Sequence, residues 1–186
     1  IKEVSFGNDG NISKERLESC INSDLANNYG NLCQRVTAFA EKNCQLKIPS
    51  NVNFLSEDLI ILDKFKNNIE NLRKEIDKQN INFYINFIVN SLFEANKYFN
   101  DQEPWKKKDD KIRLDTIVYT SLEIIRKISF MLYPIIPASV EKAIKIFDLD
   151  PKDIKFESIA NHKYLINGNT INKIDILFKK IEIKND

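Results

Sequence analysis

The stretch DLANNYGNLCQRVTAFAEKN, residues 24–43, decides the fold class of this chain. Its apolar side chains recur at spacings of four, three, four and three residues, at Leu25, Tyr29, Leu32, Val36 and Phe39. Side chains three or four residues apart share one face of a helix, so the stretch predicts an amphipathic helix. A glycine inside a helix costs about 1 kcal/mol of propensity, and Gly30 therefore indicates close packing against a neighbouring element.

The same periodicity continues through most of the 186 residues. It predicts helices over residues 14–21, 24–43, 56–77, 81–103, 111–133 and 137–149. The first, a separate short helix, is capped by Ser13, the third is capped by Ser56, and the fourth must end before Pro104. Four glycines and five prolines are too few for a β-sandwich or barrel, and a nucleotide-binding α/β fold would need a glycine-rich loop. The sequence therefore predicts an all-α fold, an antiparallel helical bundle.

The character of the sequence changes after Asp150-Pro151. The residues YLINGNTI, 164–171, place two β-favouring pairs around Asn167-Gly168, which is a typical signal for a tight hairpin turn. A small hairpin and the tail LFKKIEIK are therefore predicted to follow the bundle. This divides the chain into a leading segment, the helical bundle, and the hairpin with its tail, over residues 1–12, 13–155 and 156–186.

Composition limits the cellular setting and the partners. No apolar run approaches the ~18 residues of a membrane span, and nothing at the start resembles a signal peptide. Cys20, Cys33 and Cys44 lack CxxC spacing and are predicted to be reduced and mostly buried, as in a cytoplasmic protein without a membrane partner. The 28 basic and 27 acidic side chains leave a net charge of +1, which argues against binding of duplex DNA. A role with nucleic acid would rest on a few local contacts.

The sequence contains no recognisable set of catalytic or metal-binding residues. The only histidine, His162, is predicted to be an exposed surface residue, and no Ser, His and Asp set can be assembled without it. The sequence therefore predicts no catalytic residue and no metal site. Residue 1 is isoleucine and the single methionine is Met131, so we expect the chain to be processed or cut from a longer one.

Trp105, the only tryptophan, follows Pro104 in a predicted turn between two helices. A large aromatic side chain in a turn is either pinned into the core or presented to a ligand. The three lysines at 106–108 favour exposure, because consecutive ammonium groups need water, although such a run alone is typical of a solvated surface. Lysines beside an aromatic ring also suit single-stranded nucleic acid, where a base stacks on the ring and phosphates pass nearby.

Asn27, Asn31 and Arg35 are four residues apart and form a polar row beside the apolar face of the first long helix. Asparagine offers a donor and an acceptor, and arginine offers a rigid fork of donors, so these side chains suit recognition of base edges. A row of hydrogen bonds between two helices is the other explanation, and spacing alone favours it.

Several stretches resemble one family. NSDLANNYGNLCQR at 22–35 and NKYFNDQEPW at 96–105 resemble the two most specific motifs of the anticodon-binding domain of bacterial methionyl-tRNA synthetases. Further segments of that family resemble FGNDGNIS, LYPIIPASVEKAI and LFKKIE at 6–13, 132–144 and 177–182, in the same order. The resemblance covers almost the whole chain and implies the helical bundle of the class I aminoacyl-tRNA synthetase anticodon-binding type.

The resemblance also implies a function. The family activates methionine with ATP and magnesium and transfers it to initiator and elongator tRNAs that carry the CAU anticodon. By motif, Trp105 is implied to be the stacking platform for an anticodon base, and Pro104 to shape its turn. Asn31 and Arg35 are implied to contact the anticodon bases, above all the first-position cytosine, and Asn27 lines the same row. The row and the turn are therefore expected to converge on one site.

The catalytic motifs HIGH and KMSKS and the zinc knuckle of the family are absent from this sequence. The resemblance implies that the chain is the C-terminal part of a methionine–tRNA ligase, binds tRNA without a cofactor, is inactive alone, and has the catalytic domain of the same polypeptide as a partner. The tail LFKKIE departs from the usual LFPRIE of the family at Lys179 and Lys180.

Two other functions remain open at the level of sequence. The chain could be the anticodon-binding domain of another class I synthetase, such as those for leucine, valine, isoleucine or cysteine, which share the bundle. It could also be a non-catalytic module that binds protein through the region of Phe83, Tyr84 and Phe87.

Overall fold

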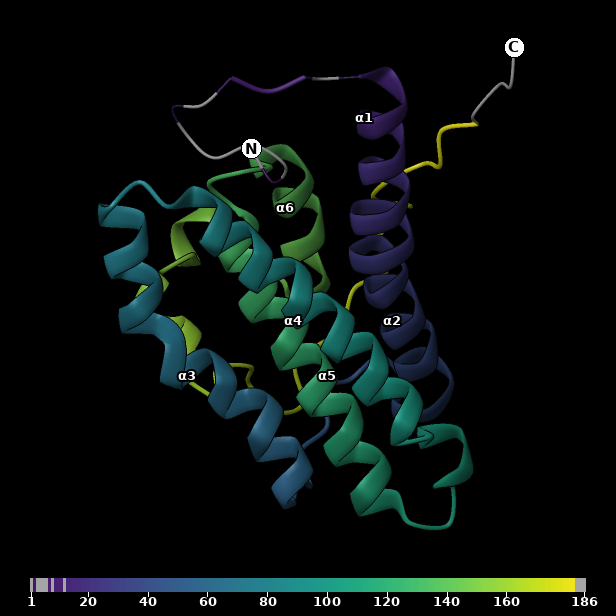
Figure 1. The fold of residues 1–186 in the computed structure, drawn as a ribbon. Helices are drawn as coiled ribbons and strands as arrows, with labels where there is room; N and C mark the ends of the chain where they lie inside the picture. Colours follow the sequence, from purple (N-terminus) through teal and green to yellow (C-terminus); the bar gives the residue numbers. More distant parts are fainter. Residues whose placement is uncertain (1, 3–6, 8, 12, 183–186) are drawn as a thin grey trace.

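The computed structural model describes residues 2, 7, 9–11 and 13–182, so most of the predicted leading segment and the last residues of the tail lie outside it. The described part is a bundle of helices without a strand, which confirms the predicted all-α fold (Figure 1). The main helices are α1, α2, α3, α4, α5 and α6, over Lys14–Cys20, Asn31–Cys44, Ser56–Asp77, Ile81–Asp101, Lys111–Leu132 and Pro137–Ala143. Short 3-10 helices lie at Pro104–Lys106, Ile144–Phe147, Pro151–Asp153 and Phe156–Ala160.

Helix α5 is the centre of the bundle and contacts α2, α3, α4 and α6. The periodicity predicted one buried face, yet every residue from 113 to 132 is buried. The additional cover is the segment 156–165, which lies on α5 and satisfies its buried charges. The Glu123 carboxylate accepts hydrogen bonds from the backbone N–H groups of Tyr164 and Leu165 at 2.6 and 2.7 Å, and Lys127 donates to the Ile159 carbonyl at 2.5 Å.

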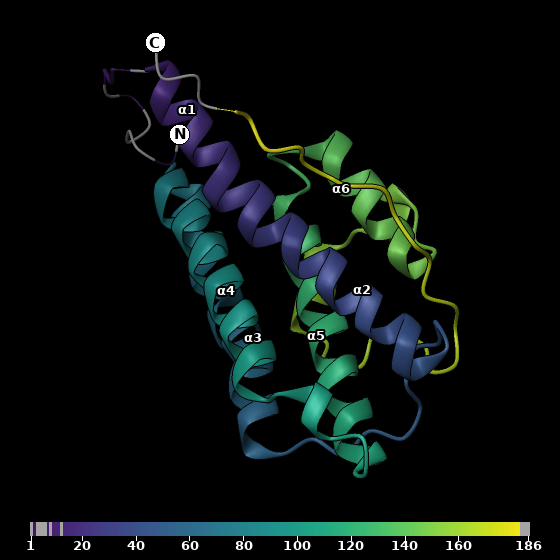
Figure 2. The ribbon, with the colours of Figure 1, turned by 90° about the vertical axis from the view of Figure 1, so that its right-hand side faces the viewer.

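The predicted break between residues 21 and 24 is wrong. The helix continues from α1 into α2 through a π-helical segment, η1, at Ile21–Gly30 (Figure 2). Ile21 keeps right-handed helical angles, with φ −62° and ψ −44°. No proline or glycine interrupts the chain at this point, so nothing opposes continuation of the helix. The wider turn of a π-helix changes which side chains face α4, and such segments are frequent at functional sites.

The predicted C-terminal hairpin is also wrong, although its turn forms. Gly168 has a φ of +83°, which the Asn-Gly pair predicted, but the residues on either side do not pair with each other. They pair instead with the segment that follows α2. The N–H of Ile48 donates to the Asn169 carbonyl, that of Gly168 to the Ile48 carbonyl, and Lys47 forms an isolated antiparallel bridge with Thr170. The backbone of residues 46–48 offered a better partner than the short local strands.

Two smaller predictions also need correction. Helix α3 begins with Leu55, not Ser56, at the cap position, because the carboxylate of Asp58 accepts the Leu55 N–H at 2.8 Å. His162 is not exposed: its side chain is 18% accessible, lies 3.5 Å from the Asp63 carboxylate, and has a pKa lowered chiefly by burial. No helix in the described part of the chain has both the length and the apolar content needed to cross a membrane.

Cys33 and Cys44 are buried, reduced thiols, as predicted. Burial raises the pKa of the Cys33 thiol far above its ordinary value, and raises that of Cys44 from 9.0 to about 11.

Because the thiolate is the reactive form, we expect Cys44 in the folded chain to react with a thiol reagent about 100-fold more slowly than in denaturant. Spectrophotometric labelling with and without denaturant measures this ratio. Fast labelling of Cys33 or Cys44 in the folded chain would contradict the burial.

Candidate nucleic-acid interface

The two motifs at residues 22–35 and 96–105 lie against each other, the first on η1 and α2 and the second at the end of α4. Two hydrogen bonds join them. The Asn96 amide donates to the side-chain oxygen of Asn28 at 2.6 Å, and Arg35 donates to the side-chain oxygen of Asn100 at 2.5 Å. These contacts, seven residues apart on η1 and α2 and four residues apart on α4, fix α4 against the helix that carries the polar row.

Arg35 and Trp105 meet on a single aromatic ring. Phe99 is 2% exposed, and the Arg35 guanidinium carbon lies 5.5 Å from the centre of its ring. The ring of Trp105 packs edge-on against Phe99 with 6.3 Å between ring centres. A buried phenyl ring thus holds the end of the polar row beside the turn. The structure therefore places Arg35, one end of the polar row, and Trp105 on the same ring.

The turn presents Trp105 rather than enclosing it. Trp105 remains 42% exposed, whereas Pro104 is buried and begins the 3-10 helix η2 at Pro104–Lys106. Glu103 enters this helix with a left-handed backbone, φ 43°, and forms an ion pair with Lys106 at 2.8 Å. The sequence left open whether Trp105 is pinned or presented. The indole is packed edge-on against Phe99, and its exposed part is accessible to a ligand.

A buried ion pair between α3 and α5 supports the turn that carries Trp105. The Asp58 carboxylate of α3 accepts two hydrogen bonds from Arg113 of α5 at 2.5 and 3.0 Å, and the Tyr98 hydroxyl donates to the same carboxylate. Arg113 also donates to the side chain of Gln102 at 2.6 Å, and Gln102 lies immediately before the turn. Burial and the Asp58 carboxylate raise the pKa of Tyr98 well above its ordinary value. The sequence does not predict this pairing of Asp58, because nothing local identifies a partner 55 residues away.

The polar row divides into a structural part and a free part. Arg35 is half-buried and bonded to α4, as the helix-to-helix explanation requires. Asn27 and Asn31 are exposed, and neither side chain hydrogen-bonds to another described residue. The helix-to-helix bond expected of them is made by Asn28 instead, which the sequence analysis missed. Two amide groups are therefore available to a ligand beside Arg35.

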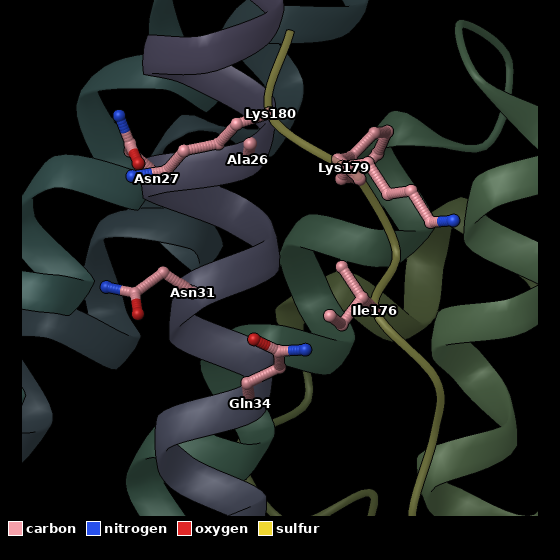
Figure 3. Close-up of a pocket in the computed structure, with 8 residues that line it drawn as sticks. Ala26, Asn27, Asn31, Gln34, Ile176, Lys179 and Lys180 are labelled. Carbon is pink, nitrogen blue, oxygen red and sulfur yellow. The ribbon is translucent and has the colours of Figure 1, made fainter. Parts of the chain in front are cut away.

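Asn27 and Asn31 stand on a ridge between two surface hollows. One, of about 580 Å³, lies between η1 and α4, and its lining includes Arg35, Phe93 and Asn100. The other, of about 620 Å³, lies between the ridge and the C-terminal tail, and Figure 3 shows its lining. An extended ligand that crosses the ridge would contact both hollows.

The tail is firmly attached to η1 beside this ridge. The ring of Phe178 packs on Tyr29 with 6.2 Å between ring centres, and lies 3.4 Å from the place where a Cβ on Gly30 would be. This confirms the close packing that Gly30 indicated. The Asn22 side chain donates to the Ile181 carbonyl at 2.9 Å and accepts its N–H at 2.8 Å. The departure from LFPRIE has therefore not prevented the tail from docking along the helix.

Comparison with known proteins gives one consistent match. Residues 48–186 match the profile of the family described as the anticodon binding domain of methionyl tRNA ligase. The chain is 37% identical over 160 residues to the methionine–tRNA ligase of Brucella suis, and 34% identical over 186 residues to that of Thermotoga maritima. These alignments cover 86% and 99% of this chain but 31% and 29% of the relatives, so the chain spans about a third of their length.

Solved structures give the same result. The free form of Mycobacterium tuberculosis methionyl-tRNA synthetase is similar with a TM-score of 0.90 and 28% identity, over 98% of this chain and 38% of that protein. The same enzyme bound by methionyl-adenylate is similar with a TM-score of 0.88 and 29% identity, over 96% of this chain and 36% of that protein.

Proposed function

The chain belongs to the family of methionyl-tRNA ligase anticodon-binding domains, and from this premise we propose that it recognises the CAU anticodon of initiator and elongator methionine tRNAs. The observation that supports this most directly is the meeting of Arg35 and Trp105 on the Phe99 ring, beside the unbonded amides of Asn27 and Asn31. An aromatic platform and a polar row on rigid helices are what recognition of unstacked bases requires.

In the proposed mechanism, the anticodon loop unstacks and one base stacks on the exposed part of Trp105, which Pro104 holds in place. The Asn31 amide and the Arg35 guanidinium contact the edge of the first-position cytosine, and Asn27 contacts the loop beside them. An amide can accept from the cytosine amino group and donate to its ring acceptors, whereas arginine only donates. The bond from Arg35 to Asn100 and its contact with Phe99 fix the guanidinium before RNA arrives.

The wider role follows from the relatives. We propose that this domain serves a cytoplasmic enzyme that joins methionine to tRNA with ATP and magnesium, with a catalytic domain of the same polypeptide as its partner. The Mycobacterium tuberculosis relative is described as bound by methionyl-adenylate, the intermediate that ATP and methionine would form. The chain has neither HIGH nor KMSKS, so we propose that it binds tRNA and does not activate methionine by itself.

The suggested protein-binding surface is weakly supported. Tyr84 is 4% exposed and its hydroxyl donates to the Met131 carbonyl at 2.7 Å, so it belongs to the core. Phe87 is partly buried against Phe65, and only Phe83 is exposed, at 38%. A single exposed phenylalanine is ordinary for a protein surface.

Replacing Asn31 with alanine tests the proposed recognition. We expect affinity for an RNA hairpin with a CAU loop to fall about tenfold, because an unpaired donor or acceptor costs ~1–3 kcal/mol. A hairpin with a changed first anticodon base should lose much less affinity. Fluorescence anisotropy titrations with both hairpins measure the difference. Asn67→Ala is the matched control, because Asn67 is an exposed asparagine on α3 away from both hollows. Equal losses for both hairpins would contradict a role in base recognition.

A further inference from the structure

The hollow between the polar row and the tail has an unusual charge distribution. Among the described residues, its lining includes Lys179, Lys180 and three residues with side-chain amides, and no residue with a carboxylate. The hollow on the α4 side includes both Asp24 and Asp101 in its lining, and these offset Arg35 and Lys97. A polyanion therefore meets attraction on the tail side and balanced charge on the α4 side.

The two lysines of the tail point in different directions. In Figure 3, the side chain of Lys180 extends across the hollow toward Asn27, whereas that of Lys179 points away from the row. The direction of Lys180 is set by its neighbours. Phe178 packs on Tyr29, and the peptide of Ile181 is held by two hydrogen bonds to Asn22. The backbone of Lys180 lies between these two anchors and is therefore held beside the ridge, and its exposed side chain is directed toward Asn27 (Figure 3).

We propose that Lys180 binds a backbone phosphate of the anticodon loop and so makes the tail part of the RNA site. The proposal rests on the proposed function, because it assumes that the loop crosses Asn27 and Asn31. The bases face Trp105 and Arg35 on the α4 side, and the phosphates run along the tail side. Lys180 thus fixes the position of the loop without distinguishing its sequence, as contacts to phosphate do in general.

The test is the salt dependence of hairpin binding by the full chain. One phosphate contact contributes a slope of about −0.7 to log K against log salt for a single strand, so Lys180→Gln should flatten the slope by that amount. At about 0.1 M salt this corresponds to a loss of roughly fivefold, the same for CAU and altered hairpins. Lys180→Arg should keep the slope. Lys179→Gln removes the same charge from the neighbouring residue and should change the slope by less than half as much.

Each outcome separates this inference from the proposed function. An unchanged slope for Lys180→Gln, or an equal change for Lys179→Gln, overturns the phosphate contact even when the wild-type chain prefers CAU. A wild-type chain that binds both hairpins equally overturns anticodon recognition, while the slopes still decide the phosphate contact. Absence of RNA binding by the wild-type chain overturns both. Lys179 and Lys180 are exposed, so equal melting temperatures are expected and verify that the variants fold.

Discussion

Replacing Trp105 with alanine is expected to weaken binding of the CAU hairpin by about 5- to 150-fold, which corresponds to the ~1–3 kcal/mol that stacking of a base on an aromatic ring contributes. The indole is 42% exposed and packs edge-on against the buried ring of Phe99, so about two fifths of its surface is available to RNA. The loss should be similar for every sequence at the stacked position, because all bases have an aromatic face. Anisotropy titrations at constant salt measure it.

The melting temperature distinguishes this role from a structural one. A half-exposed side chain leaves little cavity when truncated, so Trp105→Ala should lower the melting temperature by less than roughly 5 °C. Trp105→Phe is the matched control, because it keeps a ring for stacking and should retain much of the affinity. Wild-type affinity in the alanine variant would contradict the platform role. A larger fall in melting temperature would show that Trp105 holds the core.

Replacing Asp58 with asparagine is expected to destabilise the fold by about 3 kcal/mol, the lower end of the range for breaking a buried ion pair. Asp58 is fully buried, and the variant would leave Arg113 without its charged partner. Glu57 lies 3.6 Å from Arg113 and would offset part of the loss, which places the effect at the lower end. Urea unfolding followed by circular dichroism measures the free energy of unfolding.

Glu157→Gln provides the comparison for Asp58→Asn. Glu157 pairs with Arg73 at 2.6 Å, but both side chains are about half-exposed or more, and such pairs contribute ~0–1 kcal/mol. Because Arg113 also holds Gln102 before the turn, Asp58→Asn should weaken RNA binding as well, through the position of Trp105. Equal stabilities of the two variants would show that the buried pair contributes no more than a surface pair.

The sequence predicted the helices well because their signal is local. Each of these predictions depends on residues a few positions apart: the apolar spacing in 24–43, the helix ends near 78–80 and before Pro104, and the aromatic residue in the turn. Local pattern was misleading between residues 21 and 24. Two separate helices were predicted there, but the helix continues as η1. Local pattern failed again at Asn167-Gly168, where a correct turn pairs with residues 46–48 instead of its own flanks.

The candidate site shows the same division. Asn27, Asn31, Arg35 and Trp105 were identified from residue type and spacing, and the structure brings Arg35 and Trp105 to one ring. The sequence missed Asn28 as the residue that joins the helices. Its neighbours Asn27 and Asn31 are the same residue type, and only the geometry of η1 against α4 decides which amide faces the partner helix.

The sequence by itself therefore determined an all-α bundle, a polar row and a tryptophan in a turn, since periodicity and residue chemistry act over short separations along the chain. Only the tertiary structure decided what surrounds them. The Asp58–Arg113 pair supports the turn that contains Trp105, and the C-terminal tail places Lys180 beside Asn27 and Asn31. These contacts join residues that are 55 to 159 positions apart, as Asp58 with Arg113 and Asn22 with Ile181. Such partners are selected by the packing of the whole bundle, where burial makes an unpaired polar group costly.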